Sequence, residues 1–575
     1  QNISWTTAGT VGNVKIEYST DNGIAWAEIV NSTTNDGSHP WTVPNTPSSQ
    51  CQVRISDVAD VSSNSTSDAV FTIKVSAPPT ISLNITRLNF GAEVGDVSTS
   101  SQITTDQKFR ITNTGEGILN WTVTNDVDWI MFSNTTTAEF SATQISGVGD
   151  AVINVSVDPS GYSAGILNGT ITVSDPNSSN LSQTVNVVLT VKDPNDSDPP
   201  FGFFDTPLDG SVVSGSIAVT GWALDDIEVK HVEIKRDPDP DDNPGAIGSD
   251  GLVHIGYAFL VKGSRTDVEA LYQDYPLNDR AGWGYMMLTF GLPRRGNGSF
   301  RLYAFAEDVE GKSALLGIKD ISADNANRVN PFGTIDTPGP GQVISGSAYV
   351  NFGWALTPPA STNKFIPYDG STVYWSIDSV IIGSVDYGDN RTDIAGAFPE
   401  CLNANTAGGH KYIDTTQYAN GVHTIGWLVY DNENNGDGMG SRFFEIQNTG
   451  ATALEMTGMD SIKYKEDFSG SLRIDIDGPK EIELEELGYL KLELKAEGGK
   501  KIIGWGADKT KNLPIGSTLE EENGTFYWMP GIGFLNRHVL HFAVTDGINI
   551  SQPVEIIVNI VPKRYEKGNN EIKIK

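Results

Sequence analysis

The chain has 575 residues, more than one hydrophobic core supports, because single cores stop growing near roughly 250–300 residues. Its 60 glycines, 28 prolines and only 19% charged residues favour several turn-rich β domains over a helical protein. The formal net charge of −33 argues against nucleic-acid binding, which needs a basic surface, and against adsorption to anionic membranes, while no run approaches the roughly 18 apolar residues of a membrane span.

Residues 1–75 contain short runs in which apolar and polar side chains alternate. Val14–Tyr18 alternates, the following residues read as a turn, and Cys51–Ile55 alternates again. Strict alternation interrupted by frequent turns predicts an antiparallel β-sandwich. The wording NISWTTAGTVGNVKIEYSTDNG also resembles Ig-like modules of large secreted bacterial proteins.

The first residues predict that this module lacks its first strand. Residue 1 is Gln and no secretory signal follows, so we expect a fragment of a longer chain. Asn2–Trp5 already alternates, with Ile3 and Trp5 expected to face the core, whereas the modules it resembles begin with an earlier strand. A sandwich without that strand is expected to leave a sheet edge uncovered and to be marginally stable.

Residues 80–192 predict a second β-sandwich. Strand signals occur at Phe109–Asn113, Leu119–Val123 and Thr184–Val191, and Trp129 precedes an apolar pair that places it in the core. The order of these segments resembles the BACON domain, an Ig-like sandwich often attached to secreted enzymes that act on polysaccharides. The resemblance implies carbohydrate binding as a role of this module.

A duplicated block follows the acidic, turn-rich linker at 193–200. Phe201 opens FGFFDTPLDGSVVSGSIAVTGWALDD and Phe332 opens FGTIDTPGPGQVISGSAYVNFGWALTP, an offset of 131 residues. We assign the copies to residues 201–325 and 331–448, which also resemble Ig-like repeats of bacterial surface proteins. A repeat of domain length indicates an array, and arrays display or connect other groups more often than they catalyse.

Two pairs of residues should occupy equivalent places in the copies. Trp222 and Trp354, in the shared sequence GWAL, are expected to superimpose and to pin the core between two sheets. Arg265 and Arg391 each precede Thr-Asp. We expect each arginine to pair with a carboxylate or to cap the carbonyls of a loop.

Residues 455–562 predict a fifth sandwich, followed by a polar tail at 563–575. Leu490–Ala496 alternates as a strand. The stretch Gly524–Gly531, GTFYWMPG, resembles Ig-like or cadherin-like modules of extracellular proteins.

Catalytic motifs do not identify an enzyme. No HExxH motif occurs, and 72 acidic residues make chance carboxylate pairs inevitable. We therefore predict no catalytic residue, no cofactor-binding residue and no enzyme. Cys51 and Cys401 are too far apart to suggest a disulfide and are predicted to be small buried hydrophobic residues. The seven histidines are scattered: His39, His231, His254, His410, His423, His538 and His541.

Calcium is the one cofactor that the acidic loops suggest. Residues 237–242, with Asp250 nearby, offer several oxygen ligands, and the favoured alternative is a solvated loop. Residues 431–437 match the odd-position ligands of an EF-hand loop, but Arg442 stands where the bidentate glutamate belongs. The favoured alternative there is a hairpin turn, so no metal ligand is assigned.

Aromatic side chains are the candidates for stacking on sugar rings. Trp283 and Tyr285 are expected to be exposed, whereas the second copy has Gly409 and Tyr412 nearby but no matching tryptophan.

The sequence as a whole predicts an all-β tandem array of Ig-like antiparallel sandwiches that is secreted or held at the cell surface. Its expected function is structural and adhesive, with polysaccharide, other cell-surface glycans or surface proteins as partners and no nucleic acid or membrane insertion. Short linkers and an acidic surface are expected to keep the array soluble and extended. The alternative is the substrate-targeting region of a secreted hydrolase whose catalytic domain lies upstream.

Overall fold

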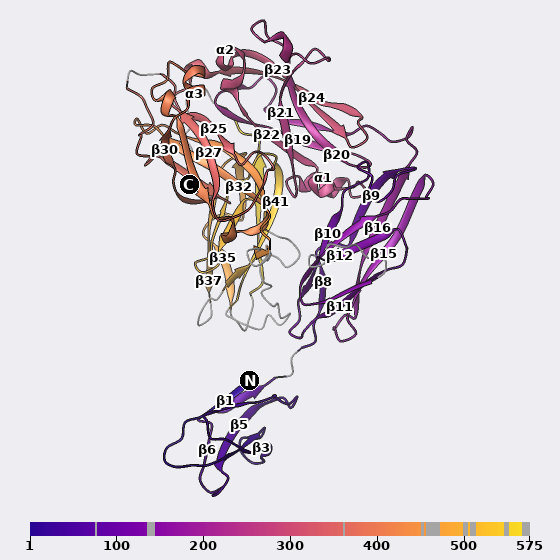
Figure 1. Cartoon of the computed structure of the whole chain (residues 1–575), viewed down its shortest axis with the longest axis vertical. Helices are drawn as coiled ribbons and strands as arrows, with labels where there is room; N and C mark the ends of the chain where they lie inside the picture. Colours follow the sequence, from indigo (N-terminus) through magenta and orange to yellow (C-terminus); the bar gives the residue numbers. More distant parts are fainter. Residues whose placement is uncertain are drawn as a thin grey trace. The chain divides into compact units, whose positions relative to one another are not determined.

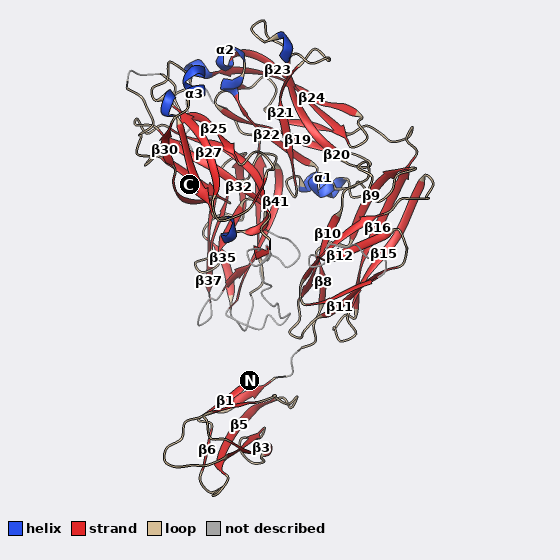
Figure 2. Cartoon of the chain, viewed as in Figure 1, coloured by secondary structure: helices blue, strands red, loops and turns tan. Residues whose placement is uncertain are grey.

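The structure is a computed structural model that describes residues 1–74, 77–134, 144–359, 363–449, 454–455, 472–497, 504–506, 513–545 and 551–565. Within these ranges the chain is almost entirely β (Figure 2). The helices are α1 (Thr266–Leu271), α2 (Pro293–Gly296), α3 (Thr392–Ala397) and short 3-10 segments, and none of those described is long and apolar enough to cross a membrane. The predicted all-β fold is confirmed.

The chain divides into two compact units, residues 1–79 with 115–118 and the remainder. In the first unit a sheet has the strand order β3-β2-β5-β6, with β7 also paired to β5, while β1 pairs with β4. Ile3 and Trp5 are only half-buried rather than core residues. The strands are β1 (Asn2–Ser4), β2 (Val14–Ser19), β3 (Ala27–Thr33), β4 (Ser38–Pro40), β5 (Ser48–Asp57), β6 (Asn64–Thr66) and β7 (Phe71–Ile73).

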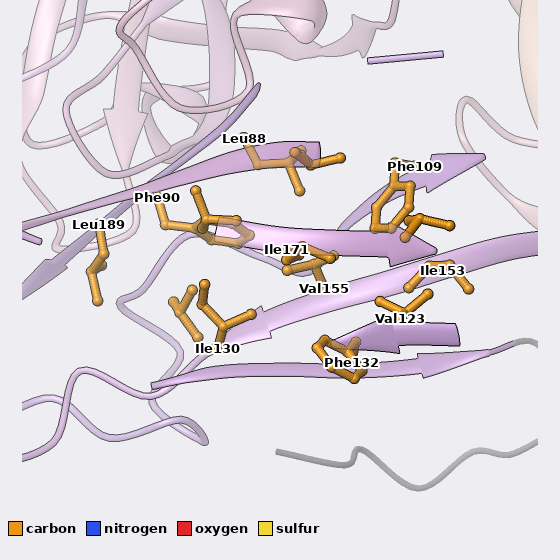
Figure 3. Packing of buried hydrophobic residues seen from close by; sticks show 14 of the residues in the cluster. Leu88, Phe90, Phe109, Val123, Ile130, Phe132, Ile153, Val155, Ile171 and Leu189 are labelled. Carbon is orange, nitrogen blue, oxygen red and sulfur yellow. The ribbon is translucent and has the colours of Figure 1, made fainter. Parts of the chain in front are cut away.

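Two facing sheets form the second module, with strand orders β12-β14-β10-β8 and β13-β11-β15-β16-β9. Alternate residues of both sheets point inward and meet in one core, where Trp129 is buried as predicted. Figure 3 shows Phe90, Phe109, Phe132 and Ile171 packed in this layer. The strands are β8 (Ile81–Leu83), β9 (Arg87–Glu93), β10 (Gln107–Asn113), β11 (Asn120–Asn125), β12 (Ile130–Asn134), β13 (Gln144–Val148), β14 (Ala151–Val157), β15 (Gly165–Ser174) and β16 (Ser182–Lys192).

In the first copy of the repeat one continuous path of strands, β17-β19-β22-β21-β20-β23-β24-β18, folds over a common core (Figure 1). The long strand β21 joins the two halves because it pairs with both β20 and β22. The strands are β17 (Phe201–Thr206), β18 (Val212–Val213), β19 (Ser216–Leu224), β20 (Val229–Arg236), β21 (Val253–Val261), β22 (Gly282–Leu288), β23 (Asn297–Asp308) and β24 (Ser313–Asp324).

The second copy separates the same path into two sheets, β25-β27-β31-β30 and β26-β33-β32-β28-β29. Its core again lies between them. The strands are β25 (Phe332–Thr337), β26 (Val343–Ile344), β27 (Tyr349–Leu356), β28 (Val373–Ile377), β29 (Val380–Ser384), β30 (Asp386–Asp389), β31 (Gly408–Ile413), β32 (Ala419–Tyr430) and β33 (Gly436–Ile446).

The predicted equivalences between the copies are confirmed. Trp222 lies opposite Phe203 in the first copy, and Trp354 lies opposite Thr334 in the second, which is the same strand register. Arg265 and Arg391 each occupy the residue before a short helix, α1 or α3. Both arginines pair with carboxylates, so the predicted structural role is also confirmed.

The predicted position of the GWAL tryptophans between two sheets is wrong. Trp354 packs with Phe332 and Phe398 in a small cluster separate from the main core of the copy. Trp222 lies in the matching cluster with Phe201 and Tyr272. Both tryptophans are held on the outer face of their sheet by the segment that follows α1 or α3, because that segment supplies Tyr272 or Phe398.

Trp283, predicted to be exposed, lies instead in the main core of the first copy with 0% exposure. The second copy has Gly409 at that place and fills the space with Trp427 from the opposite sheet, since Trp427 contacts the positions of Gly353 and Gly409. Tyr285, also predicted to be exposed, is only partly exposed, whereas Tyr412 is exposed. The core tryptophan therefore comes from β22 in the first copy and from β32 in the second, and it fills a similar volume in both.

The last module shares its core with both copies of the repeat. Its hydrophobic cluster contains Trp528 and Leu540, and it continues into Ala218 and Val261 of the first copy and Phe443 of the second. The described strands are β34 (Leu454–Glu455), β35 (Arg473–Ile476), β36 (Glu481–Glu485), β37 (Leu490–Glu497), β38 (Gly504–Gly506), β39 (Ser517–Glu520), β40 (Thr525–Trp528), β41 (Asn536–Thr545) and β42 (Val554–Val561).

The expectation of an extended string of separate sandwiches is therefore wrong for these three modules. Hydrophobic side chains that an isolated sandwich would expose to water are buried between neighbours. The predicted polar tail also contributes, because Tyr565 packs against the core of the first copy and its hydroxyl accepts a hydrogen bond from the Ala218 amide at 3.2 Å. Residues 566–575 of that tail lie outside the described residues.

Candidate functional site

In the acidic run at 237–242, the carboxylates of Asp237, Asp239 and Asp242 are engaged by cations or a hydroxyl. Both oxygens of Asp242 accept hydrogen bonds from the Arg236 guanidinium at 2.6 Å, and Asp239 pairs with Arg294. Most carboxylates of this acidic run are therefore already paired within a surface loop. The remaining pairs are Asp237 with the Tyr303 hydroxyl at 2.9 Å and Asp250 with Lys235 at 2.8 Å.

The acidic run at 431–437 forms the turn of the β32–β33 hairpin, which confirms the favoured alternative to an EF-hand. Asp431 accepts hydrogen bonds from the amides of Glu433 and Asn435 through one oxygen. Its other oxygen lies 3.1 Å from the Lys364 ammonium, and these two side chains are 0% and 1% exposed. An internal cation therefore neutralises this carboxylate.

Four carboxylates gather in the first copy where it meets the 80–192 module. We call Asp225, Asp226, Asp308 and Glu310 the junction cluster. Asp225 and Asp226 directly follow β19, while Asp308 ends β23 and Glu310 lies in the next turn. Oxygen atoms of Asp225, Asp226 and Glu310 all lie within 4.8 Å of one another.

Two oxygens in the junction cluster are satisfied by the backbone. Asp225 Oδ2 accepts hydrogen bonds from the amides of Ile227 and Glu228 at 2.8 and 3.0 Å. Asp308 Oδ1 accepts one from the Lys312 amide at 2.7 Å. Three further oxygens, Asp225 Oδ1, Asp308 Oδ2 and Glu310 Oε2, are buried without a hydrogen-bond donor among the described residues.

The electrostatics of the junction cluster are correspondingly unfavourable to ionised carboxyls. Burial, followed by the charges of Asp226, Glu310 and Asp308, raises the pKa of Asp225 to about 7, although the Ile227 amide opposes the rise. Burial also raises the pKa values of Asp308 and Glu310. Like charges that are close together and removed from water favour the neutral forms.

The junction cluster adjoins several contacts between the two modules. Lys192, at the end of β16, lies 2.9 Å from Asp226. The Thr104 hydroxyl donates to the Ile227 carbonyl at 2.7 Å, and the Thr105 amide donates to Glu228 at the same distance. The linker at 193–200 is held here too, because the Lys312 ammonium donates to the Ser197 carbonyl at 2.8 Å.

The sequence patterns alone do not indicate the junction cluster. Its signal is the difference between the copies after GWAL, where the first copy continues with Asp225-Asp226 and the second with Thr357-Pro358. Asp308 and Glu310 are more than 80 residues further along the chain. Only the folded arrangement of β19 and β23 brings the two pairs together.

A cleft of about 480 Å³ lies between the two copies. Tyr285, one of the predicted sugar-stacking residues, lines it together with Tyr257, Met286, Phe443 and Arg442. Burial lowers the pKa of the Arg442 guanidinium, which donates to the Thr334 hydroxyl at 3.2 Å. The cleft thus combines aromatic and aliphatic walls with a cation, within the usual size range of ligand sites.

No protein-family model matches the chain, and no curated protein matches its sequence. Among solved structures, fibronectin(III)-like modules of Clostridium thermocellum CbhA are 13% identical, with 42% of this chain and 100% of that chain covered and a TM-score of 0.14. The extracellular cadherin domains of protocadherin gamma B2 are 12% identical, with 90% and 86% covered and a TM-score of 0.15.

Dimeric latent PorU from Porphyromonas gingivalis is 10% identical, with 68% of this chain and 36% of that chain covered and a TM-score of 0.26. With TM-scores this low, these similarities support no conclusion about function.

Proposed function

We propose that this chain is a non-catalytic extracellular structural and adhesion array. Its division into modules at 1–75, 80–192, 201–325, 331–448 and 455–562 belongs to the same proposal. The main support is the hydrophobic core that both copies and the last module share. A core that continues across module boundaries resists bending at those boundaries, which suits a scaffold that presents a surface.

Polar and aromatic contacts between the copies support the same role. Phe290 of the first copy stacks on Phe332 of the second with ring centroids 3.8 Å apart. The buried Arg328 guanidinium, which follows the first copy, pairs with Asp437 of the second. Removing either partner of a buried ion pair is strongly destabilising, so the copies are expected to remain docked.

Calorimetry of the full chain tests the scaffold. Residues 201–565 should unfold in one cooperative transition, because separating the modules would expose their shared core. Phe443→Ala should lower the midpoint of that transition for all three modules together. Three independent transitions, of which the variant shifts only one, would contradict the rigid scaffold.

Carbohydrate binding is the second candidate function, with polysaccharides or other cell-surface glycans as ligands. The BACON-like sequence of residues 80–192 supports it, and so does the cleft with Tyr257 and Tyr285. A glycan array of the full chain tests it, with Tyr257→Ala and Tyr412→Ala as matched variants. Both tyrosines are exposed, but only Tyr257 lines the cleft.

Loss of glycan binding in Tyr257→Ala alone assigns binding to the cleft, whereas binding retained in both variants favours the 80–192 module. A chain that binds no glycan would be a scaffold for protein partners. The alternative of a substrate-targeting region for a secreted hydrolase also predicts glycan binding, and it differs in expecting the polysaccharide that the hydrolase cleaves.

A further inference from the structure

We propose that the junction cluster binds one divalent cation, Ca²⁺, through Asp225 and Glu310, whose carboxylate oxygens lie within 4.8 Å of each other. This site lies outside both acidic loops that the sequence suggested, and it does not depend on the adhesive role proposed above. It rests on a comparison of the two copies and on the oxygen atoms left without donors.

The second copy shows what occupies the equivalent place. Asp308 and Asp431 begin the same turn, because each amide donates to the carbonyl four residues later, in Lys312 or Asn435, at 3.0 Å. Asp225 is equivalent to Thr357, which also follows GWAL. In the second copy the Thr357 hydroxyl donates to Asp431 Oδ2 at 3.1 Å.

The Lys364 ammonium lies 3.1 Å from the same Asp431 oxygen. A positive charge therefore occupies this place in the second copy.

The first copy has more negative charge at this place than the second. Aspartate replaces Thr357, and Glu310 has a side chain that is only 3% exposed, whereas the equivalent Glu433 is exposed. Among the residues that the structure describes, Asp225 Oδ1, Asp308 Oδ2 and Glu310 Oε2 are buried without donors. Charged oxygens that are buried and unpaired are strongly unfavourable, so a bound cation would stabilise the ionised cluster.

The two nearby lysines do not reach those three oxygens. Lys192 lies 2.9 Å from Asp226 Oδ2, and Lys312 lies 3.7 Å from Glu310 Oε1. The same two ammonium groups also approach Asp198 and Glu93, so carboxylates outnumber ammonium groups here and the excess negative charge favours a divalent ion. The donors are all hard oxygens, and Ca²⁺ accepts such ligands in flexible geometry, whereas Mg²⁺ requires a near-ideal octahedron.

Thermal unfolding of the full chain after chelator treatment tests this site. Extracellular modules bind Ca²⁺ with Kd of roughly 10⁻⁴–10⁻³ M, so about 10 mM CaCl₂ should raise the midpoint of the single 201–565 transition by roughly 2–4 °C. Asp225→Asn and Glu310→Gln should each abolish the rise. Without Ca²⁺ both variants should melt higher than the unaltered chain, because each removes one repelling charge. The matched control is Asp241→Asn, an exposed carboxylate of the same copy, which should respond like the unaltered chain.

Terbium luminescence locates the bound ion independently of stability. Burial and then the charge of Asp226 raise the pKa of Tyr275, which places its phenol near the cluster. Tb³⁺, which shares the oxygen preference of Ca²⁺, should emit on tyrosine excitation and be displaced by CaCl₂. Tyr275→Phe and Glu310→Gln should each weaken the emission several-fold.

The proposal is overturned if CaCl₂ leaves the midpoint unchanged, since protons would then neutralise the cluster. It is equally overturned if Asp225→Asn and Glu310→Gln keep both the full thermal shift and the Tb³⁺ emission, because the ion would then bind elsewhere. A shift lost only in Asp241→Asn would transfer the site to the 237–242 loop and would also overturn it.

Discussion

Tryptophan residues fill equivalent volumes in the two copies from different strands. The first copy has Trp283 on β22 and Ala304 on β23, and both side chains are fully buried in the same core. The second copy places Gly409 on β31 and Trp427 on β32. Interiors are close-packed, so such a core retains its volume even when the residue that supplies it changes.

Exchanging the two residues of the second copy tests this interpretation. Trp427→Ala should lower the free energy of unfolding by about 3–5 kcal/mol, partly because the indole also donates to Asn351 at 2.8 Å. Gly409→Trp should be destabilising alone, since a side chain there meets Val385 and Trp427. The double variant, which reproduces the first copy, should recover part of the loss in a double-mutant cycle.

Denaturant unfolding measures all four chains of this cycle. Losses that simply add would show that Gly409 and Trp427 do not share one space.

At the level of single elements, one arginine holds each of the two equivalent helices α1 and α3 in place. Arg265 donates to Asp267 at 2.9 and 2.8 Å and to Asp205 at 2.5 Å. Arg391 makes the same three bonds, two to Asp393 and one of 2.6 Å to Asp336. The carboxylates come from the end of the first strand and from the helix, so the arginine ties the helix to its sheet.

Replacing these arginines by lysine should have unequal effects. A lysine cannot make the bidentate contact, and Arg265 has a side chain 5% exposed where that of Arg391 is 14% exposed. Arg265→Lys should therefore cost about 2–4 kcal/mol, and Arg391→Lys about half as much. Urea unfolding monitored at each copy measures both, and equal losses would contradict a dependence on burial.

At the scale of the whole molecule, Glu486 joins the last module to the first copy. Its carboxylate accepts a hydrogen bond from the Thr206 hydroxyl at 3.2 Å, and its other oxygen is buried without a donor among the described residues. Burial raises its pKa to about 7, although the hydroxyls of Thr220 and Thr206 oppose the rise. The contact between modules is therefore strongest when this carboxyl is protonated.

Stability should fall as the pH rises through this pKa. A raised folded-state pKa gives stability that is fully present below the ordinary value of 4.5 and is lost as the pH passes about 7. Below the ordinary pKa of 4.5, Glu486→Gln should be as stable as the unaltered chain. Above the raised pKa of about 7, it should unfold at a higher denaturant concentration than the unaltered chain. Glu485→Gln, an exposed neighbour, is the control. An unchanged pH profile in Glu486→Gln would contradict this assignment.

Much of the local structure of this protein can be predicted from its sequence. Alternation predicted strands such as β37 at Leu490–Glu497, whose inward positions are buried as expected. The repeat predicted that Arg265 and Arg391 are equivalent and bonded to carboxylates. These features depend on neighbours in the chain or on residues within one copy, so pattern and spacing are sufficient to find them.

How the modules join and where charges meet depends on contacts between residues that are far apart in the chain. The prediction that Trp283 is exposed was wrong because alternation does not say which face of a strand a second sheet covers. The shared core around Phe443 depends on modules docking, which no local pattern records. The junction cluster was missed because Asp225 and Glu310 come together only when β19 and β23 pack into one copy. Burial, which raises the pKa of Asp225 to about 7, is itself a property of that packing.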